Sequence, residues 1–129
     1  MQMKRMKLLS GHQEMMPYLV IKDAENFIDF IKRIFNAQEM VRKVDPQHQI
    51  QYAEVTVGSS TLLISEASPS YPAQCISMFV YVLDADRTYY DALEEGAKPL
   101  MFPLEEDNNA RSAGFQDPFG NTWWLSTLN

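Results

Sequence analysis

Histidine, cysteine and carboxylate side chains carry much of protein chemistry, and this chain has few of the first two. Its only histidines are His12, in a basic N-terminal segment, and His48, which ends the turn Asp45-Pro46-Gln47-His48. A metal site built from two imidazoles and one carboxylate would need both histidines to leave those places. We therefore expect two solvated histidines and no metal triad.

Nucleophilic and nucleotide chemistry have no visible motif. The chain contains no glycine-rich phosphate loop, no Cys-x-x-Cys pair and no Ser-His-Asp ordering. Cys75, the single cysteine, follows a Pro- and Ser-containing stretch with no base predicted beside it. We expect Cys75 to be unreactive, and we assign no catalytic residue.

Glu54 is the carboxylate that deserves a functional hypothesis. Strand alternation over 50–57 places Tyr52, Glu54 and Thr56 on one face and the residues between them on the other. If that face lines a cavity, Glu54 is a buried acid with a raised pKa that binds a ligand or acts as a base. If it faces solvent, Glu54 is an ordinary surface carboxylate, and the sequence leaves both open.

Arg111 is the second polar candidate, because it follows an acidic loop and precedes Ser112-Ala113-Gly114. Its guanidinium could bind a ligand carboxylate with two hydrogen bonds. It could equally form a salt bridge to Glu105, Glu106 or Asp107.

The elements that position these residues occur in the same order twice. The first half predicts a strand at 18–21, Asp23 as helix N-cap, an amphipathic helix over 24–37, and strands at 39–44, 50–57 and 61–65. The second half predicts a strand at 78–83, Asp84 as N-cap, a helix ended by Gly96, and strands at 98–102, 112–116 and 122–128. An α+β fold made of an internal repeat follows.

The register of the repeat is read from a few matched residues. Aligning Asp23 with Asp84 also pairs Met40 with Met101, and a shift of one residue then matches Glu54 to Gln116 and Gly58 to Gly120. The turn Asp117-Pro118-Phe119-Gly120 suits a tight connection between strands. Periodicity alone also allows two ferredoxin-like units or a dimeric α+β barrel.

Composition limits partners and location. The 129 residues suffice for one domain, and the net charge of −6, with basic residues gathered at the N-terminus, disfavours nucleic-acid binding. One cysteine, no signal peptide and no membrane span predict a cytoplasmic protein. We expect residues 1–14 to form a flexible basic tail and residues 15–129 to form the domain.

Beyond residue 15 the chain resembles the vicinal oxygen chelate superfamily, which includes glyoxalase I, bleomycin-resistance proteins and extradiol dioxygenases, and looks closest to its PhnB-like branch. The strings that carry the resemblance are PYLVIKDAENFIDFIKRIFNAQE, YAEVTVGSSTLLIS, VYVLDADRTYYDALEEGA and RSAGFQDPFGNTWWLST. The resemblance implies two tandem βαβββ modules, 15–66 and 77–129 with a linker at 67–76. Their curved mixed sheets would form a glyoxalase-like cleft, often completed in a homodimer.

The resemblance also implies where a metal would be held. The family's ligand positions correspond to Met16, Ser77, about Leu62, and Trp124. None of these is a normal ligand for Zn, Mn, Ni or Fe, which take imidazole or carboxylate at such sites. We therefore expect neither a metal nor another cofactor.

The same resemblance predicts a ligand pocket with an aromatic lining. Tyr18, Phe79 and Tyr81 share the strand parity of the family's ligand positions, Trp124 would add an apolar wall, and the PhnB-like pattern has an arginine near position 111. The alternative for Phe79 and Tyr81 is an ordinary core position. The predicted ligand-binding residues are Tyr18, Tyr52, Glu54, Phe79, Tyr81, Arg111, Gln116 and Trp124.

Together these observations favour a metal-independent protein that binds a small hydrophobic or aromatic molecule, and they favour binding over catalysis without deciding whether there is an enzymatic activity. One alternative is a metal-dependent lyase, isomerase or dioxygenase with displaced ligands such as His48 and Glu54. Another is a protein–protein interaction module whose cavity is closed.

Overall fold

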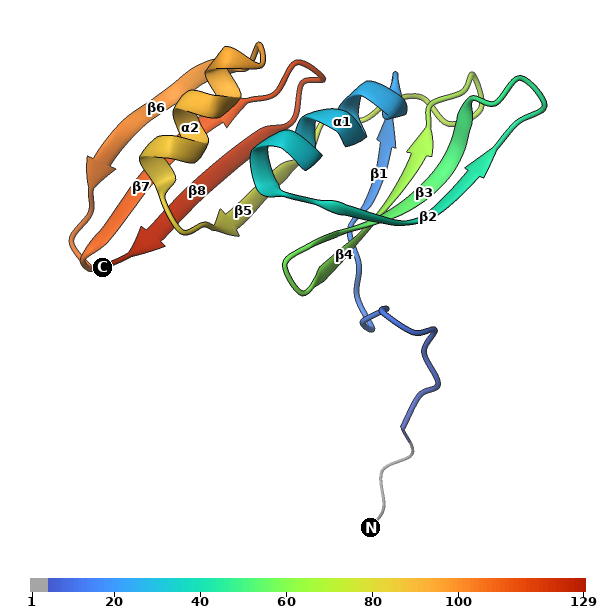
Figure 1. The fold of residues 1–129 in the computed structure, drawn as a ribbon, viewed down its shortest axis with the longest axis horizontal. Helices are drawn as coiled ribbons and strands as arrows, with labels where there is room; N and C mark the ends of the chain where they lie inside the picture. Colours follow the sequence, from blue (N-terminus) through green and yellow to red (C-terminus); the bar gives the residue numbers. More distant parts are fainter. Residues whose placement is uncertain (1–4) are drawn as a thin grey trace.

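The computed structural model describes residues 5–129, which form two βαβββ modules (Figure 1). In the first module the elements are β1 (Tyr18–Ile21), α1 (Ala24–Phe35), β2 (Gln38–Val44), β3 (Ile50–Val57) and β4 (Ser60–Glu66). In the second they are β5 (Ser77–Tyr81), α2 (Ala85–Glu94), β6 (Lys98–Glu105), β7 (Ala110–Gln116) and β8 (Thr122–Leu128). The predicted repeat and the α+β fold are confirmed.

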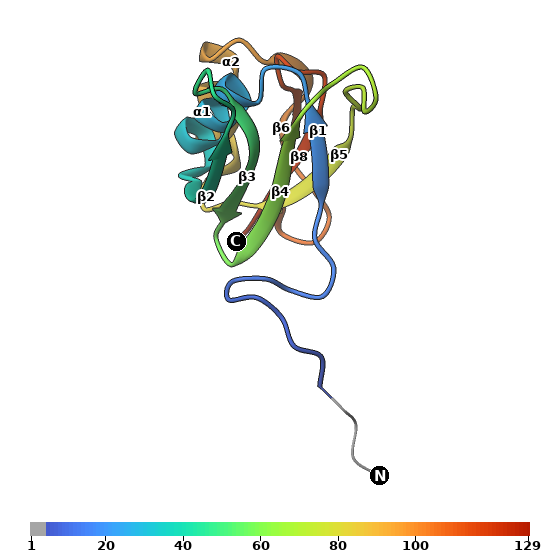
Figure 2. The same ribbon diagram turned by 90° about the vertical axis from the view of Figure 1, so that its right-hand side faces the viewer.

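Each module folds into its own four-stranded mixed sheet. The strand orders are β1-β4-β3-β2 and β5-β8-β7-β6, in which the first strand of each module runs parallel to the last and the other pairings are antiparallel. The two sheets lie side by side, and α1 and α2 cover the same side of them (Figures 1 and 2). No helix within residues 5–129 is long and apolar enough to cross a membrane.

Helix α1 joins the two modules. The buried residues of α1, among them Ala24, Phe27, Phe30 and Ile31, lie on more than one face of the helix. Phe30 meets Phe115 of β7 with ring centroids 6.1 Å apart, and Phe35 meets Trp123 of β8 at 4.8 Å. One helix therefore packs against its own sheet and against the second module, and the two modules share one core.

The last strand of each module holds the N-terminus of that module's helix. Asp23 is at the predicted N-cap position but has φ of 68°, and its side chain does not cap α1. Instead the Glu66 carboxylate accepts hydrogen bonds from the backbone N–H groups of Asp23 and Ala24, at 2.9 and 2.8 Å. Asp84 does cap α2, by accepting from Arg87 N–H at 3.1 Å, and Gly96 follows the helix with positive φ as predicted.

The second module has a matching contact between its last strand and the alanine that begins its helix. The hydroxyl of Thr127 in β8 accepts a hydrogen bond from the N–H of Ala85 at 2.8 Å and donates to the carbonyl of Val82 at 2.9 Å. Glu66 and Thr127 thus do the same task in the two modules with different chemistry. This attachment fixes each helix on one side of its sheet.

The turn 117–121 is held by one buried carboxylate. Asp117, only 3% exposed, accepts hydrogen bonds from the N–H groups of Phe119 and Asn121, the Asn121 amide and the Trp123 indole, at 2.8 to 3.2 Å. Asn121 in turn accepts from the N–H of Ile76, which ties the linker to the second module. Gly120 has φ of 91° and lies against Cys75. The turn has the geometric role that its sequence predicts.

One buried hydroxyl is left without a partner among the described residues. Tyr89 of α2 is fully buried, and no hydrogen bond to its hydroxyl is present in residues 5–129. Burial also raises the pKa of Tyr89. An unpaired buried hydroxyl costs about 1–3 kcal/mol of folding free energy.

Tyr89→Phe should therefore raise the free energy of unfolding by about 1 kcal/mol, because it removes the unpaired hydroxyl and keeps the ring. Urea unfolding followed by circular dichroism measures the change. The control is Tyr90→Phe, since Tyr90 is half-exposed. A Tyr89→Phe variant less stable than the wild type would show that the hydroxyl has a stabilising partner.

Candidate functional site

Each sheet has one face packed on the helices and one face left uncovered by them, which we call the open face. In the first sheet Leu19, Ala53 and Ile64 are buried in the core, and their neighbours along the strands point the other way. The open face of this sheet therefore carries Tyr18, Tyr52 and Glu54. Because the helices lie on one side, the open faces of both sheets lie on the opposite side (Figure 2).

Two tyrosines and a carboxylate dominate the open face of the first sheet. Tyr52 donates its hydroxyl hydrogen to Glu54 Oε2 at 2.7 Å, and the hydroxyls of Tyr18 and Ser65 are 2.6 Å apart. The ring centroids of Tyr18 and Tyr52 are 6.5 Å apart, and the Lys43 ammonium lies 5.6 Å from the centre of the Tyr52 ring. The structure brings these three predicted site residues together.

His12 completes this group, although sequence reasoning placed it in solvent. Its Nε2 lies 2.7 Å from Glu54 Oε1, and the two side chains are only 13% and 14% exposed. The segment that carries His12 is tied to β4, because Thr61 donates its hydroxyl to the Gly11 carbonyl and the Gln13 amide donates to the Thr61 carbonyl at 3.3 Å. The second half of the predicted tail thus contacts the first module.

These contacts decide the protonation of Glu54. The hydrogen bond from His12 and then that from Tyr52 lower the pKa of Glu54 below its usual range, against the opposing effect of burial. The hypothesis of a raised pKa is therefore wrong, and Glu54 is a carboxylate at neutral pH. Burial and the bond to Glu54 raise the pKa of Tyr52 to about 12, so Tyr52 stays a neutral donor.

The open face of the second sheet is aromatic and largely bare. Phe79 and Tyr81 of β5 are 60% and 66% exposed, with ring centroids 5.1 Å apart in an edge-to-face arrangement, and Trp124 of β8 is 38% exposed. The Trp124 ring lies on Gly114 of β7, where a Cβ would collide with it. Phe79 and Trp124 are direct partners in the parallel β5–β8 pair, so these side chains form one cluster.

Strand pairing corrects the sequence register between the modules. Tyr18 pairs with Leu63 and Phe79 pairs with Trp124, so Leu63 on the open face is the counterpart of Trp124, while Leu62 is in the core. Glu54 pairs with Leu63 as Gly114 pairs with Trp124, which makes Gly114 the counterpart of Glu54. Gln116 pairs with Thr122 at the end of β7 and is therefore not the match of Glu54.

Arg111 lies apart from the other predicted residues. It has the strand parity of the buried Ala113, and its guanidinium donates two hydrogen bonds to Asp86 of α2 at 2.9 and 3.0 Å. A longer contact of 3.9 Å reaches Glu105. Arg111 holds the pKa of Asp86 below its usual range, and the pair links β7 to the start of α2 on the helix side.

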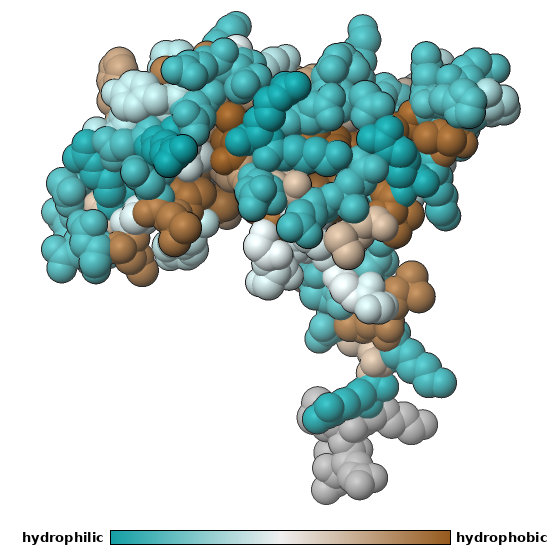
Figure 3. Space-filling view, viewed as in Figure 1, coloured by the Kyte–Doolittle hydropathy of each residue, from teal (hydrophilic) through white to brown (hydrophobic). Residues whose placement is uncertain are grey.

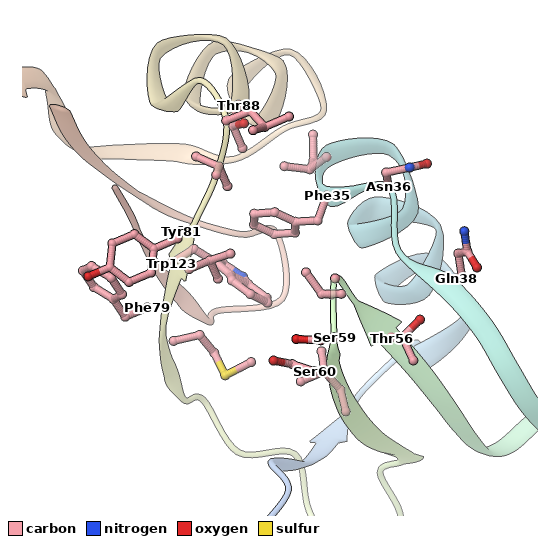
Figure 4. A pocket seen from close by; sticks show the side chains of 18 of the residues that line it. Phe35, Asn36, Gln38, Thr56, Ser59, Ser60, Phe79, Tyr81, Thr88 and Trp123 are labelled. Atoms are coloured by element: carbon pink, nitrogen blue, oxygen red, sulfur yellow. The ribbon is translucent and has the colours of Figure 1, made fainter. Parts of the chain in front are cut away.

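A cavity of about 1170 Å³ lies between the modules (Figure 4). The C-terminal end of α1, the β3–β4 hairpin, β5 and the first turns of α2 line it, with Phe35 and Trp123 near its centre. Among the predicted site residues only Phe79 and Tyr81 line it, and they project from the other side of β5 (Figure 4). On the helix side the surface is mostly hydrophilic, and hydrophobic side chains show in the hollow between the modules (Figure 3).

The side chains that could donate to a metal ion are not arranged to hold a catalytic metal. Within residues 5–129 no three His, Cys, Asp or Glu side chains come together in a way that could hold a metal ion. His48 is exposed in the turn between β2 and β3, and Glu54 is already bonded to His12 and Tyr52. The positions that the family resemblance points to hold Met16, which precedes β1, Ser77 and Trp124, and strand pairing puts Leu63 in the place expected for Leu62.

Comparison with known proteins agrees with this geometry. An uncharacterized protein of Mycobacterium bovis, Mb0911c, is 26% identical over 120 residues, covering 84% of this chain and 79% of that protein. The structure of TioX from Micromonospora sp. ML1 superposes with a TM-score of 0.75 at 18% identity, over 92% of this chain and 100% of TioX. The PhnB protein of Bacillus cereus, a putative 3-demethylubiquinone-9 3-methyltransferase, gives a TM-score of 0.70 at 12% identity, over 90% of this chain and 100% of its own.

Residues 12–125 match the family model of the Glyoxalase/Bleomycin resistance protein/Dioxygenase superfamily. That range begins at His12 and ends within β8, and the order of strands and helices is the one that the resemblance implied. The chain belongs to the glyoxalase/bleomycin resistance protein/dioxygenase superfamily.

Proposed function

We propose that this protein binds a small hydrophobic or aromatic molecule on its open face, without a metal, and that it does so as a homodimer in the cytoplasm. The observation that carries the proposal is the exposed cluster of Phe79, Tyr81 and Trp124. Large aromatic side chains gathered on one surface cost free energy in water, and such patches commonly mark binding sites.

The polar groups of the same side favour binding over chemistry. The first sheet offers Tyr18, Tyr52 and Glu54, whose hydrogen bonds hold them in fixed positions. Ligand sites typically combine an apolar lining with a few placed polar groups, and the two open faces together supply both. The proposal assigns no catalytic residue.

A metal-dependent lyase, isomerase or dioxygenase has less support. That alternative needs Glu54 and His48 as displaced ligands, whereas Glu54 is bonded to His12 and Tyr52 and His48 lies in an exposed turn. Metal chemistry would therefore require both a broken hydrogen-bonded group and a moved turn.

The neutral aromatic dye N-phenyl-1-naphthylamine tests the site. Its fluorescence should rise saturably on binding to the wild type, and Phe79→Ala or Trp124→Ala should weaken binding about tenfold, the equivalent of about 1.4 kcal/mol from a lost aromatic contact. Tyr71→Ala is the matched control, because Tyr71 is an exposed aromatic residue of the linker. Fluorescence titration gives the dissociation constants.

The same titration tests independence from metal. We expect one binding curve with EDTA and with added Zn²⁺, Mn²⁺, Ni²⁺ or Fe²⁺, and no metal-induced rise in Tm, since a metal bound to the folded state would raise it. Equal dye binding by wild type and both cluster variants would refute the site. Loss of binding in EDTA that returns with one metal would refute the metal-independent mode.

The homodimer follows from the same exposed surface. A second copy laid over the open face would remove Phe79, Tyr81 and Trp124 from water and turn an open surface into an enclosed site. The acidic charge of the chain, −6, keeps nucleic acid an unfavourable partner.

Sedimentation equilibrium measures the oligomeric state. We expect a mass twice that of one chain for the wild type and a monomer for Tyr81→Glu, because the buried charge would face the apolar surface of the partner. Tyr71→Glu places the same charge in the linker and should remain a dimer. A wild type that is monomeric throughout the micromolar range would contradict the dimer.

A further inference from the structure

Glu54 is the one carboxylate of the described open faces whose two oxygens are both bonded to side chains. Its Oε2 accepts from the Tyr52 hydroxyl and its Oε1 meets His12 Nε2, each at 2.7 Å. The side chain is only 14% exposed, yet it sits on the face that the helices leave uncovered. The imidazole ring of His12 therefore already contacts this carboxylate.

The surroundings of Glu54 suit a cation attached to an aromatic body. A largely buried carboxylate forms strong charge-assisted hydrogen bonds with protonated nitrogens. Tyr52 is bonded to Glu54, the Tyr18 ring lies 6.5 Å from the Tyr52 ring, and the Lys43 ammonium lies 5.6 Å from the centre of the Tyr52 ring. Aromatic faces attract cations and stack on other rings, so the same patch recognises both parts of such a molecule.

His12, which contacts the Glu54 carboxylate, belongs to the segment that precedes β1. Thr61 of β4 forms hydrogen bonds with Gly11 and Gln13. Met6 and Leu9, which precede these residues, are exposed. Releasing His12 breaks few contacts and leaves the core intact, because none of these residues is in the hydrophobic core. A ligand cation could take its place without unfolding either sheet.

We propose that Glu54 binds the protonated amine of an aromatic ligand, and that His12 occupies Glu54 until the ligand displaces it. The inference rests on the proposed function and names its ligand class, aromatic amines. Glu54 supplies the charge for recognition because it stays ionised at neutral pH. His12 competes with the ligand for Glu54 and so lowers the affinity of the protein for the ligand. A neutral analogue gains too little from Glu54 to displace His12.

Tryptamine and its neutral alcohol counterpart, tryptophol, test the class because they share the indole and differ in the charged group. In NMR titrations of the full chain, tryptamine should bind the wild type about tenfold more tightly than tryptophol, the ratio expected for about 1.4 kcal/mol from one charge-assisted contact. Glu54→Gln should remove this preference, so that the two compounds bind the variant with equal affinity. His12→Ala should tighten tryptamine binding severalfold.

The controls separate these effects from general ones. His48→Ala removes the other histidine, and Glu106→Gln removes an exposed carboxylate of the β6–β7 loop, so both should bind like the wild type. Unchanged backbone amide spectra outside the neighbourhood of β3 verify the fold of each variant.

Equal affinity of the wild type for tryptamine and tryptophol would overturn the inference and leave the proposed aromatic site standing. Absence of binding by either compound would overturn both. Tryptamine binding that His12→Ala leaves unchanged would overturn the role of His12 as a competitor.

Discussion

The packing of α1 against both modules is the constraint on which the rest of the structure depends. Phe30 and Phe35 reach Phe115 and Trp123 across the module boundary, so one helix supplies the core of two sheets. Because strand side chains alternate, filling the helix side commits the intervening residues to the other side. Both open faces therefore point the same way, and this side carries the aromatic and acidic residues.

The two open faces differ in chemistry although the backbone repeats. At matching places in the β ladders the first sheet has Leu63 and Glu54, and the second has Trp124 and Gly114. The Trp124 ring lies over Gly114, which has no side chain, whereas Leu63 is smaller than Trp124 and leaves room for the Glu54 carboxylate and its donors. A repeated module can thus offer an apolar contact at one end and a charged contact at the other.

The sequence predicted the elements of the fold well, because their signals are local. Helical spacing in 24–37, turn residues at 45–47 and 117–121, and the order of the repeat all appear in the structure. What depends on distant contacts was missed. Glu66, not Asp23, holds the start of α1, and Arg111 reaches Asp86 on another element.

The sequence predicted which residues share the open face, but it did not predict the effect of their contacts on the pKa of Glu54. Alternation grouped Tyr52 with Glu54, and strand parity grouped Phe79 with Tyr81, but no pattern in the sequence links His12 to a strand more than forty positions away. Without that contact the pKa of Glu54 was expected to rise, and it falls. The register between the modules was also wrong, because it aligned Gly58 with Gly120 although the turn between β7 and β8 is longer than the turn between β3 and β4.

Mapping the binding of a neutral aromatic probe by NMR decides where the ligand binds, because Gly114 and Trp124 of the open face do not line the cavity between the modules. With side-chain and amide signals assigned, titration of N-phenyl-1-naphthylamine should shift Phe79, Tyr81, Gly114 and Trp124 together. Shifts centred instead on Phe35, Thr56 and Ser59, which line the cavity, would place the ligand between the modules and contradict the account.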